Sequence, residues 1–384
     1  MKRKTLVFIV LALALASLPA AAQQLSQPPS GDNQRSEVTQ WMGPVSVTVT
    51  YSSPDVHAPN GDDRTGHIWG ELVPWGVAPN PFYPGFGTAE TMPWRAGANE
   101  NTTVTFSHAV EVEGKPVAAG TYGLHLVPGE SGWGVILSSN STSWGSFFYD
   151  PSEDALRVDV KPEEAPYREW LTYDFVDRRL DSTVLALHWE KLRVPVRISV
   201  PDVVDLYVSR IDSELRGSTG FFWQNWNSAA QFLLQRNAHP EKALAWARVA
   251  ADANRGQENF TTLSTLSQAL SANGQGKESE EIFQRALAHP TATPGQIHQA
   301  GRQLVAAGDK ERALAVFQTN LERFDGAWPT EVGMVRGLAA VGRYAEALPH
   351  AKKALEQAKA QNDAVNTGSL ENMIQRLEAG QDVN

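Results

Sequence analysis

The first half of the chain alternates apolar and polar residues with a period of two. In the stretch VSVTVTY, Val45, Val47, Val49 and Tyr51 fall on one side of an extended chain, and serine or threonine falls on the other. Such alternation predicts a strand with one face buried against a core. Similar short segments predict further strands at residues 102–106, 110–112, 121–127, 133–137, 156–160, 170–175, 184–189 and 194–200.

The connections between these segments carry residues that favour turns. They include Gly114-Lys115-Pro116, Pro128-Gly129 and Asp150-Pro151-Ser152. About nine strands with short connections, and no helical period among them, are typical of an antiparallel sandwich. The pattern therefore predicts an all-β, jelly-roll-like sandwich over residues 37–201.

After residue 201 the pattern changes to helical repeats. Small residues recur at Ala250, Ala286, Asn320 and Ala354, at spacings of 36, 34 and 34 residues. This period resembles that of tetratricopeptide repeats, in which small residues let paired antiparallel helices approach closely. The resemblance implies an all-α array over residues 225–384, after a linker helix at 202–224 and with a capping helix at 368–379. It also implies a concave groove that binds a protein or an extended peptide.

The N-terminus has the layout of a secretory signal peptide. Lys2, Arg3 and Lys4 precede an apolar run that is too short to span a bilayer, and small residues stand at Ala20 and Ala22. We predict a signal peptide at residues 1–22 and a periplasmic or secreted protein. The polar segment QQLSQPPSGDNQRS at 23–36 predicts a flexible lead-in.

The charge balance and the cysteine count exclude several classes of function. The chain has 33 basic and 43 acidic residues, and cleavage after Ala22 would leave 30 basic residues. A net acidic chain argues against nucleic acid and anionic membrane surfaces as partners, and no second apolar run predicts insertion into a membrane. The absence of cysteine excludes disulfides, thiol catalysis and thiolate zinc sites.

No motif of a standard enzyme or cofactor-binding class occurs, so no cofactor is predicted. Asp62, Asp63 and His67 lie in one loop, but acidic loops are usually solvated and no closing ligand follows. We therefore predict no metal site, and the catalytic residues, if there are any, stay unknown.

The tryptophans of the first half divide into two groups. Trp170 and Trp189 lie within strand periods and are predicted to pack in the core. Trp75, Trp94 and Trp144 lie in loops with glycine nearby, and we expect them at a binding surface.

The stretch WRAGANE concentrates polar chemistry in one loop. Arg95 offers a planar set of donors, Asn99 offers donors and an acceptor, and Glu100 offers acceptors, while Gly97 permits a sharp turn. Such a set suits sugar hydroxyls or a carboxylate. The alternative is that Arg95 and Glu100 satisfy each other. The predicted ligand-binding candidates are Trp94, Arg95, Asn99, Glu100 and His125.

Five motifs occur in an order that resembles a known bacterial family. They are YSSPDV, RTGHIWGELVPWG, WRAGANENTTVTFS, VEGKPVAAGTYGLHLVPG and GWGVILSSN. Over residues 45–200 the chain resembles domain-of-unknown-function family 2911, an exported family with no assigned activity. Residues 77–93 are an insertion relative to that pattern. We expect either a lid or wall over the WRAGANE site or a plain surface loop.

Three functions are compatible with these features. The first is a binding module that holds a small molecule or glycan on the sandwich and a partner on the repeats. The second is an envelope assembly factor that acts through the repeats alone. The third is a hydrolase or lyase that uses Glu100 with Arg95 and His125 or His67, although glycoside hydrolysis generally needs two carboxylates. We favour the binding module over the assembly factor, and both over the enzyme.

Overall fold

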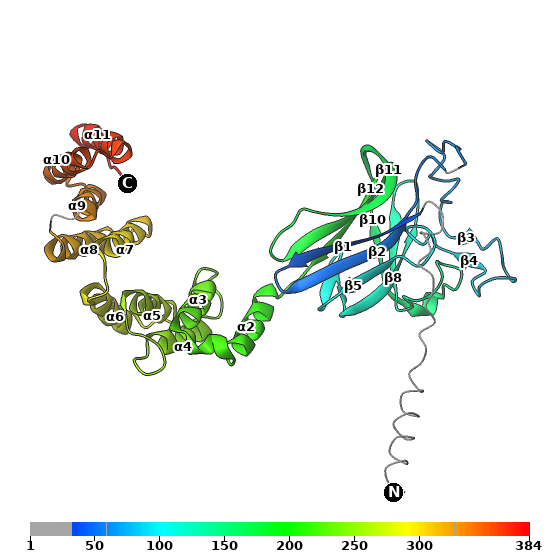
Figure 1. Cartoon of the computed structure of the whole chain (residues 1–384), viewed down its shortest axis with the longest axis horizontal. Helices are drawn as coiled ribbons and strands as arrows, with labels where there is room; N and C mark the ends of the chain where they lie inside the picture. The colour runs from blue at the N-terminus through cyan, green and yellow to red at the C-terminus, as the bar shows by residue number, and fades with distance from the viewer. Residues whose placement is uncertain (1–32, 59, 326–327) are drawn as a thin grey trace, which may run out of the picture. The chain divides into compact units, whose positions relative to one another are not determined.

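The computed structural model describes residues 33–58, 60–325 and 328–384. The predicted signal peptide and most of the predicted lead-in lie outside the described residues. The chain divides into two compact units between Tyr207 and Val208. The first unit is built from antiparallel sheets and the second from helices (Figure 1).

A six-stranded antiparallel sheet forms one layer of the first unit, in the order β1-β2-β5-β8-β9-β10. Its strands are β1 (Gln34–Met42), β2 (Val45–Ser53), β5 (Thr103–Phe106), β8 (Gly120–Val127), β9 (Trp133–Ser138) and β10 (Asp154–Val160). Val49 pairs with Val38 on one side and Val104 on the other. Buried and less buried residues alternate along most of β2, as its sequence predicts.

A four-stranded sheet forms the second layer, in the order β11-β12-β6-β7. Its strands are β11 (Glu163–Val176), β12 (Ser182–Ser199), β6 (Val110–Val112) and β7 (Lys115–Val117). The two sheets share one apolar core, in which Val49 and Leu126 of the first sheet join Leu187 of the second. This shared core confirms the predicted β-sandwich, and no barrel is closed by the described strands. A separate two-stranded hairpin consists of β3 (Ala78–Pro79) and β4 (Thr91–Met92).

Several strands differ from the prediction. β1 begins at Gln34, inside the predicted lead-in, and is a strand because it pairs with β2 along its whole length. The segments at 184–189 and 194–200 form the single strand β12, which continues through Glu190 in a left-handed conformation (φ 52°). β7 lies where a turn was expected, at Lys115.

The two tryptophans predicted to pack in the core have different surroundings. Trp189 is 1% exposed and packs in the core as predicted, whereas Trp170 is 38% exposed, so its prediction is wrong. Both residues lie in strands, but alternation alone does not tell which face of a strand is covered.

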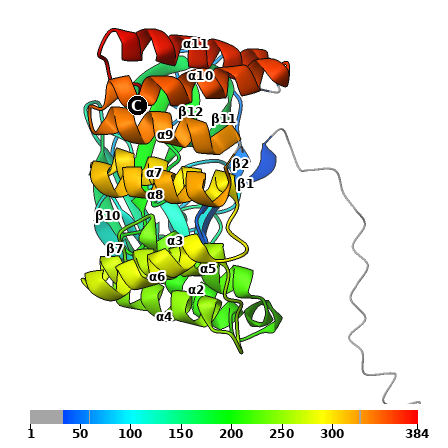
Figure 2. The ribbon, with the colours of Figure 1, turned by 90° about the vertical axis from the view of Figure 1, so that its left-hand side faces the viewer.

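The second unit is a stack of helix pairs followed by one further helix (Figure 2). The helices are α2 (Val203–Glu214), α3 (Trp223–Leu234), α4 (Pro240–Ala251), α5 (Phe260–Ala272), α6 (Gly276–Ala288), α7 (Pro294–Ala306), α8 (Lys310–Arg323), α9 (Trp328–Ala340), α10 (Tyr344–Ala360) and α11 (Ala364–Glu378). The first turn of α2 belongs to the sandwich unit. The starts of α5, α7 and α9 recur every 34 residues, which confirms the predicted tetratricopeptide-like array. No helix in the described ranges is long and apolar enough to cross a membrane.

The small-residue positions lie inside the helix pairs. Ala250, Ala286, Asn320 and Ala354 are each fully buried. Asn320 is tolerated because its side-chain amide donates to the carbonyl of Pro294 at 2.9 Å. This one hydrogen bond compensates in part for the departure from the usual alanine, since the side-chain oxygen of Asn320 is buried without a partner.

Phe317 occupies the centre of the array and is fully buried. Glycines at 301, 333 and 337 face its ring, and a Cβ added at Gly301 would lie 2.5 Å from it. We predict that Phe317→Ala lowers the free energy of unfolding of the repeats by about 3–5 kcal/mol, because it leaves a cavity. Urea unfolding followed by the helical circular dichroism signal measures this loss. The matched control is Phe221→Ala, at a side chain that is 84% exposed, and an equal loss in both variants would contradict the prediction.

Candidate ligand-binding cavity

The WRAGANE loop is fastened to the six-stranded sheet by backbone hydrogen bonds. Trp94 and Leu126 of β8 exchange two N–H···O bonds of 2.8 Å. The amide of Ala98 donates to the carbonyl of Ser52 at 3.0 Å. Both ends of the loop are therefore attached to the sheet.

One side of the loop serves as a structural support. Ala96 is fully buried, and its carbonyl accepts from the hydroxyls of Thr102 (3.2 Å) and Tyr173 (2.8 Å). Gly97 is required by close packing, because a Cβ there would lie 2.7 Å from the Thr102 hydroxyl. The left-handed residues are instead Ala96 (φ 55°) and Asn99 (φ 56°), so the turn does not depend on Gly97 as the sequence suggested.

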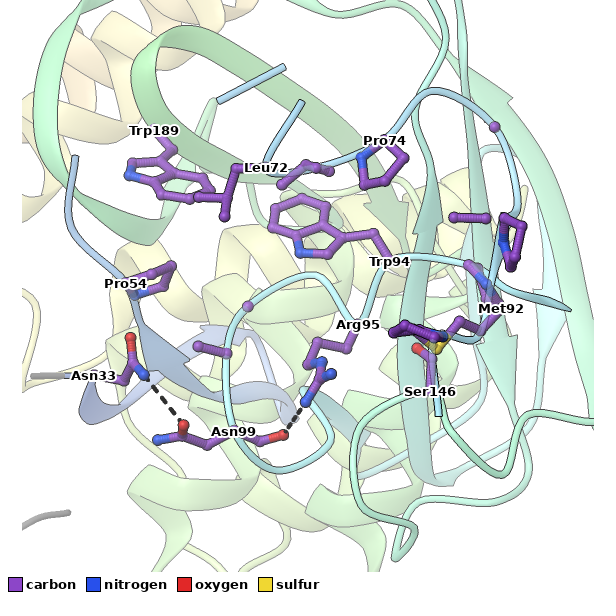
Figure 3. Close-up of a pocket in the computed structure, with 18 of the residues that line it drawn as sticks. Asn33, Pro54, Leu72, Pro74, Met92, Trp94, Arg95, Asn99, Ser146 and Trp189 are labelled. Atoms are coloured by element: carbon purple, nitrogen blue, oxygen red, sulfur yellow. Dashed lines mark hydrogen bonds between the residues drawn. The ribbon is translucent and has the colours of Figure 1, made fainter. Parts of the chain in front are cut away.

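The other side of the loop lines a cavity of about 520 Å³. Figure 3 shows Trp94, Trp189 and Leu72 along one part of the wall and Arg95 with Asn99 along another. Trp94 packs edge-on against Trp69 with ring centroids 5.8 Å apart, and stacks on Trp189 at 6.2 Å. These contacts fix the apolar wall, and a cavity of this size suits a small molecule.

Arg95 is held in the cavity wall without an acidic partner. Its Nη1 donates to the carbonyl of Asn99 at 2.7 Å, and its guanidinium lies 4.8 Å from the ring centre of Phe147. The backbone of Gly145 packs so closely that a Cβ would lie 2.6 Å from Nη1. Burial lowers the pKa of Arg95. Among the described residues no carboxylate forms an ion pair with this guanidinium.

The cavity wall as a whole is apolar and basic. Arg64 is a second arginine of the lining, and the described lining residues include neither aspartate nor glutamate. The few other polar groups include Asn99, whose side-chain oxygen accepts from Asn33 at 3.1 Å, and Ser146. The site thus offers positive charge beside an apolar surface.

Glu100 and His125 do not line this cavity. Glu100 is exposed and accepts a hydrogen bond from the Ser52 hydroxyl at 3.1 Å. His125 is 2% exposed, and its Nδ1 lies 2.9 Å from the hydroxyl of Ser146. Burial, together with the charge of Arg95, lowers the pKa of His125 to about 4. The structure therefore brings Trp94, Arg95 and Asn99 together and leaves the other two candidates outside.

The insertion at 77–93 supplies one wall of the cavity. The residues that do so are Ala78, Pro79, Pro81, Met92 and Pro93. Of the two alternatives that the sequence left open for this insertion, a wall over the site and a plain surface loop, the structure shows the wall. Arg64 and Ser146 also line the cavity and were not predicted to do so. Arg64 opens the motif RTGHIWGELVPWG, but nothing in that motif points to a cavity shared with WRAGANE, and Ser146 lies in none of the five motifs.

The remaining candidates lie elsewhere on the sandwich. Trp75 and Trp144 are exposed and do not line the cavity. Asp63 lies 3.5 Å from His57, and His67 pairs with Glu71 at 2.9 Å. Within the described ranges, no group of three or more histidine, aspartate or glutamate residues is placed to hold a metal ion.

Comparison with known proteins supports the family resemblance predicted for the sandwich. A family model described as "Protein of unknown function (DUF2911)" matches residues 33–198. The predicted resemblance is confirmed. The residues that match are those of the sandwich and its cavity.

Solved structures similar to this chain have low sequence identity to it. One, described as a kinesin light chain of Podosopora anserina with nearly identical TPR-like repeats, is 15% identical. The match covers 41% of this chain and 85% of that one, with a TM-score of 0.31. Another, a double mutant of MamA RS-1, is 15% identical over 44% of this chain and 99% of that one, with a TM-score of 0.26. No curated protein matches this chain.

The low pKa of His125 predicts that acid destabilises the sandwich. The unfolded histidine titrates near 6.5 and the folded one near 4, so only the unfolded state binds this proton between those pH values. Stability should fall by about 3 kcal/mol as the pH drops through that window. We expect His125→Gln to show a shallower loss in urea unfolding followed by tryptophan fluorescence at pH 7, 5.5 and 4.5. His108→Gln, at the surface, is the control, and identical pH slopes in all three proteins would refute the assignment.

Proposed function

We propose that the chain is an exported binding protein with two sites. The sandwich cavity binds a small molecule that carries an anionic group on an apolar body, and the helical repeats bind a protein or peptide. The observation that carries the proposal is the position of Arg95, a partly buried guanidinium without an acidic partner in a mostly apolar wall. Export is supported by the signal-peptide pattern at residues 1–22.

The ligand class follows from what the cavity wall can satisfy. A partly buried charge without a counter-ion is costly, and a ligand carboxylate or phosphate relieves that cost through charge-assisted hydrogen bonds. Leu72 and Met92 offer apolar contact and no hydrogen-bond partner, and Trp94 offers a single indole N–H, which is too little for a row of hydroxyls. An apolar anion therefore fits this wall better than a neutral sugar does.

The repeat unit has a groove of its own, with a volume of about 610 Å³. Side-chain amides and hydroxyls from α5 and α7 line it, among them Gln268, Gln299, Gln303 and Ser264. Such groups can hydrogen-bond the backbone of an extended peptide. This lining supports a protein or peptide partner for the repeats.

The two other functions fit the geometry less well. An enzyme that uses Glu100 would need it beside the ligand, yet Glu100 lies outside the cavity. His125 is buried, and it is neutral above its pKa of about 4. Its contact with the cavity wall is through the hydroxyl of Ser146. An assembly factor that acts through the repeats alone would leave the Arg95 cavity without a role.

Calorimetric titration with decanoate tests the cavity proposal. We expect the mature chain to bind decanoate and Arg95→Gln to bind it at least about tenfold more weakly, because a hydrogen bond to a charged group contributes on the order of 1.5–3 kcal/mol. The matched control is Arg168→Gln, since the Arg168 side chain is 42% exposed on β11 and lies outside the cavity lining. Equal affinities for all three proteins, or no binding by the unchanged chain, would overturn the proposal.

A further inference from the structure

An exposed aromatic surface lies at the tip of the β3–β4 hairpin and the segment packed against it. We define the aromatic patch as Phe82, Tyr83, Phe86 and Phe148, whose exposed fractions are 58%, 44%, 45% and 36%. The hairpin lies away from the strands of the two main sheets (Figure 1). Exposed aromatic side chains that gather in this way mark an interaction surface rather than the ordinary scatter of single apolar residues.

Hydrogen bonds and ring contacts within the sandwich hold the loop that carries the patch. The Asn80 side chain is 6% exposed and donates to the carbonyls of Phe86 and Ala89, both at 3.0 Å. The amides of Thr88 and Ala89 both donate to the carbonyl of Phe147 at 3.0 Å. Phe86 packs on Phe147 with ring centroids 5.2 Å apart. The aromatic rings are therefore presented on a fixed loop, which reduces the entropy lost on binding.

Charge is excluded from both segments that form the surface. One residue in five of the chain is charged, yet none is charged from Leu72 to Ala89 or from Ser131 to Tyr149. The nearest carboxylate in the hairpin, Glu90, is hydrogen-bonded to Tyr83. An uncharged surface rich in phenylalanine, tyrosine, proline and glycine is suited to the interfacial region of a bilayer, where aromatic side chains are favoured and charges are costly.

We infer that the aromatic patch docks the sandwich on a lipid surface. The choice of a lipid rests on the proposed function, because the same hairpin lines the cavity that is proposed to take an apolar anion, and on the absence of charged residues from both segments of the patch. Docking at an interface requires no spanning helix. Because the chain carries a net charge of −10, attraction comes from the aromatic rings, and zwitterionic lipid suffices.

Vesicle co-sedimentation of the mature chain tests this inference. The protein should pellet with pure phosphatidylcholine vesicles, with little dependence on salt. The double variant Phe82→Ser/Phe86→Ser should lower the partition coefficient by about tenfold or more, because two apolar side chains are lost from the interface. The matched control is Phe221→Ser/Phe222→Ser, whose rings are 84% and 59% exposed on the helical unit, and it should pellet like the unchanged chain.

Four results would overturn the inference. They are no pelleting of the unchanged chain, equal pelleting of both double variants, binding only after phosphatidylglycerol is added, and self-association in sedimentation velocity that the hairpin variant abolishes. The last result would assign the patch to a second copy of the chain. Decanoate titration separates this inference from the cavity proposal: the hairpin variant should bind decanoate as the unchanged chain does, and Arg95→Gln should bind it at least about tenfold more weakly.

Discussion

The contact between the Arg95 guanidinium and the carbonyl of Asn99 determines what the sandwich cavity can do. It fixes a positive charge in the wall of a cavity whose described lining contains no carboxylate. Phe147 and the backbone of Gly145 hold the guanidinium from another side. A partly buried charge in such surroundings is satisfied best by an anion from outside the chain.

The rest of the WRAGANE loop keeps that charge in place. Ala96 faces inward, where Thr102 and Tyr173 hold the loop against the sheets, and Gly97 packs against Thr102 while it also lines the cavity. Trp94 connects the loop to the core through its stack on Trp189. The family signature thus combines two roles, since inward residues build the scaffold and outward residues line the cavity. Both readings of the sequence, a ligand site and a structural turn, describe part of the same loop.

The sequence predicted the architecture well because its two periods are physical consequences of the fold. Alternation at Val45, Val47 and Val49 reflects one covered face, and the 34-residue spacing reflects repeated packing of helix pairs. Strand β1 was missed because its partner, not its own pattern, makes it a strand. Trp170 was wrongly predicted to be buried because a period of two does not tell which face of a strand packs against the core.

The candidate site was predictable only in part. The signature pointed to Trp94, Arg95 and Asn99, but whether adjacent side chains share a face depends on local backbone conformation. Left-handed Asn99 ends the part of the loop that lines the cavity, and Glu100 follows it into solvent. The insertion at 77–93 was recognised as a possible wall, but only the tertiary fold decides between a wall and a surface loop, and only the fold brings Arg64 to the cavity.

Nuclear magnetic resonance of the arginine side chains tests the central claim most directly. The Nε–H resonance of Arg95 can be assigned by comparing the unchanged chain with Arg95→Lys. Addition of decanoate should shift this resonance saturably, whereas decanol, with the same apolar chain and no charge, should leave it nearly unchanged. A resonance that decanoate does not move, or that both compounds move equally, would contradict an anion site at Arg95.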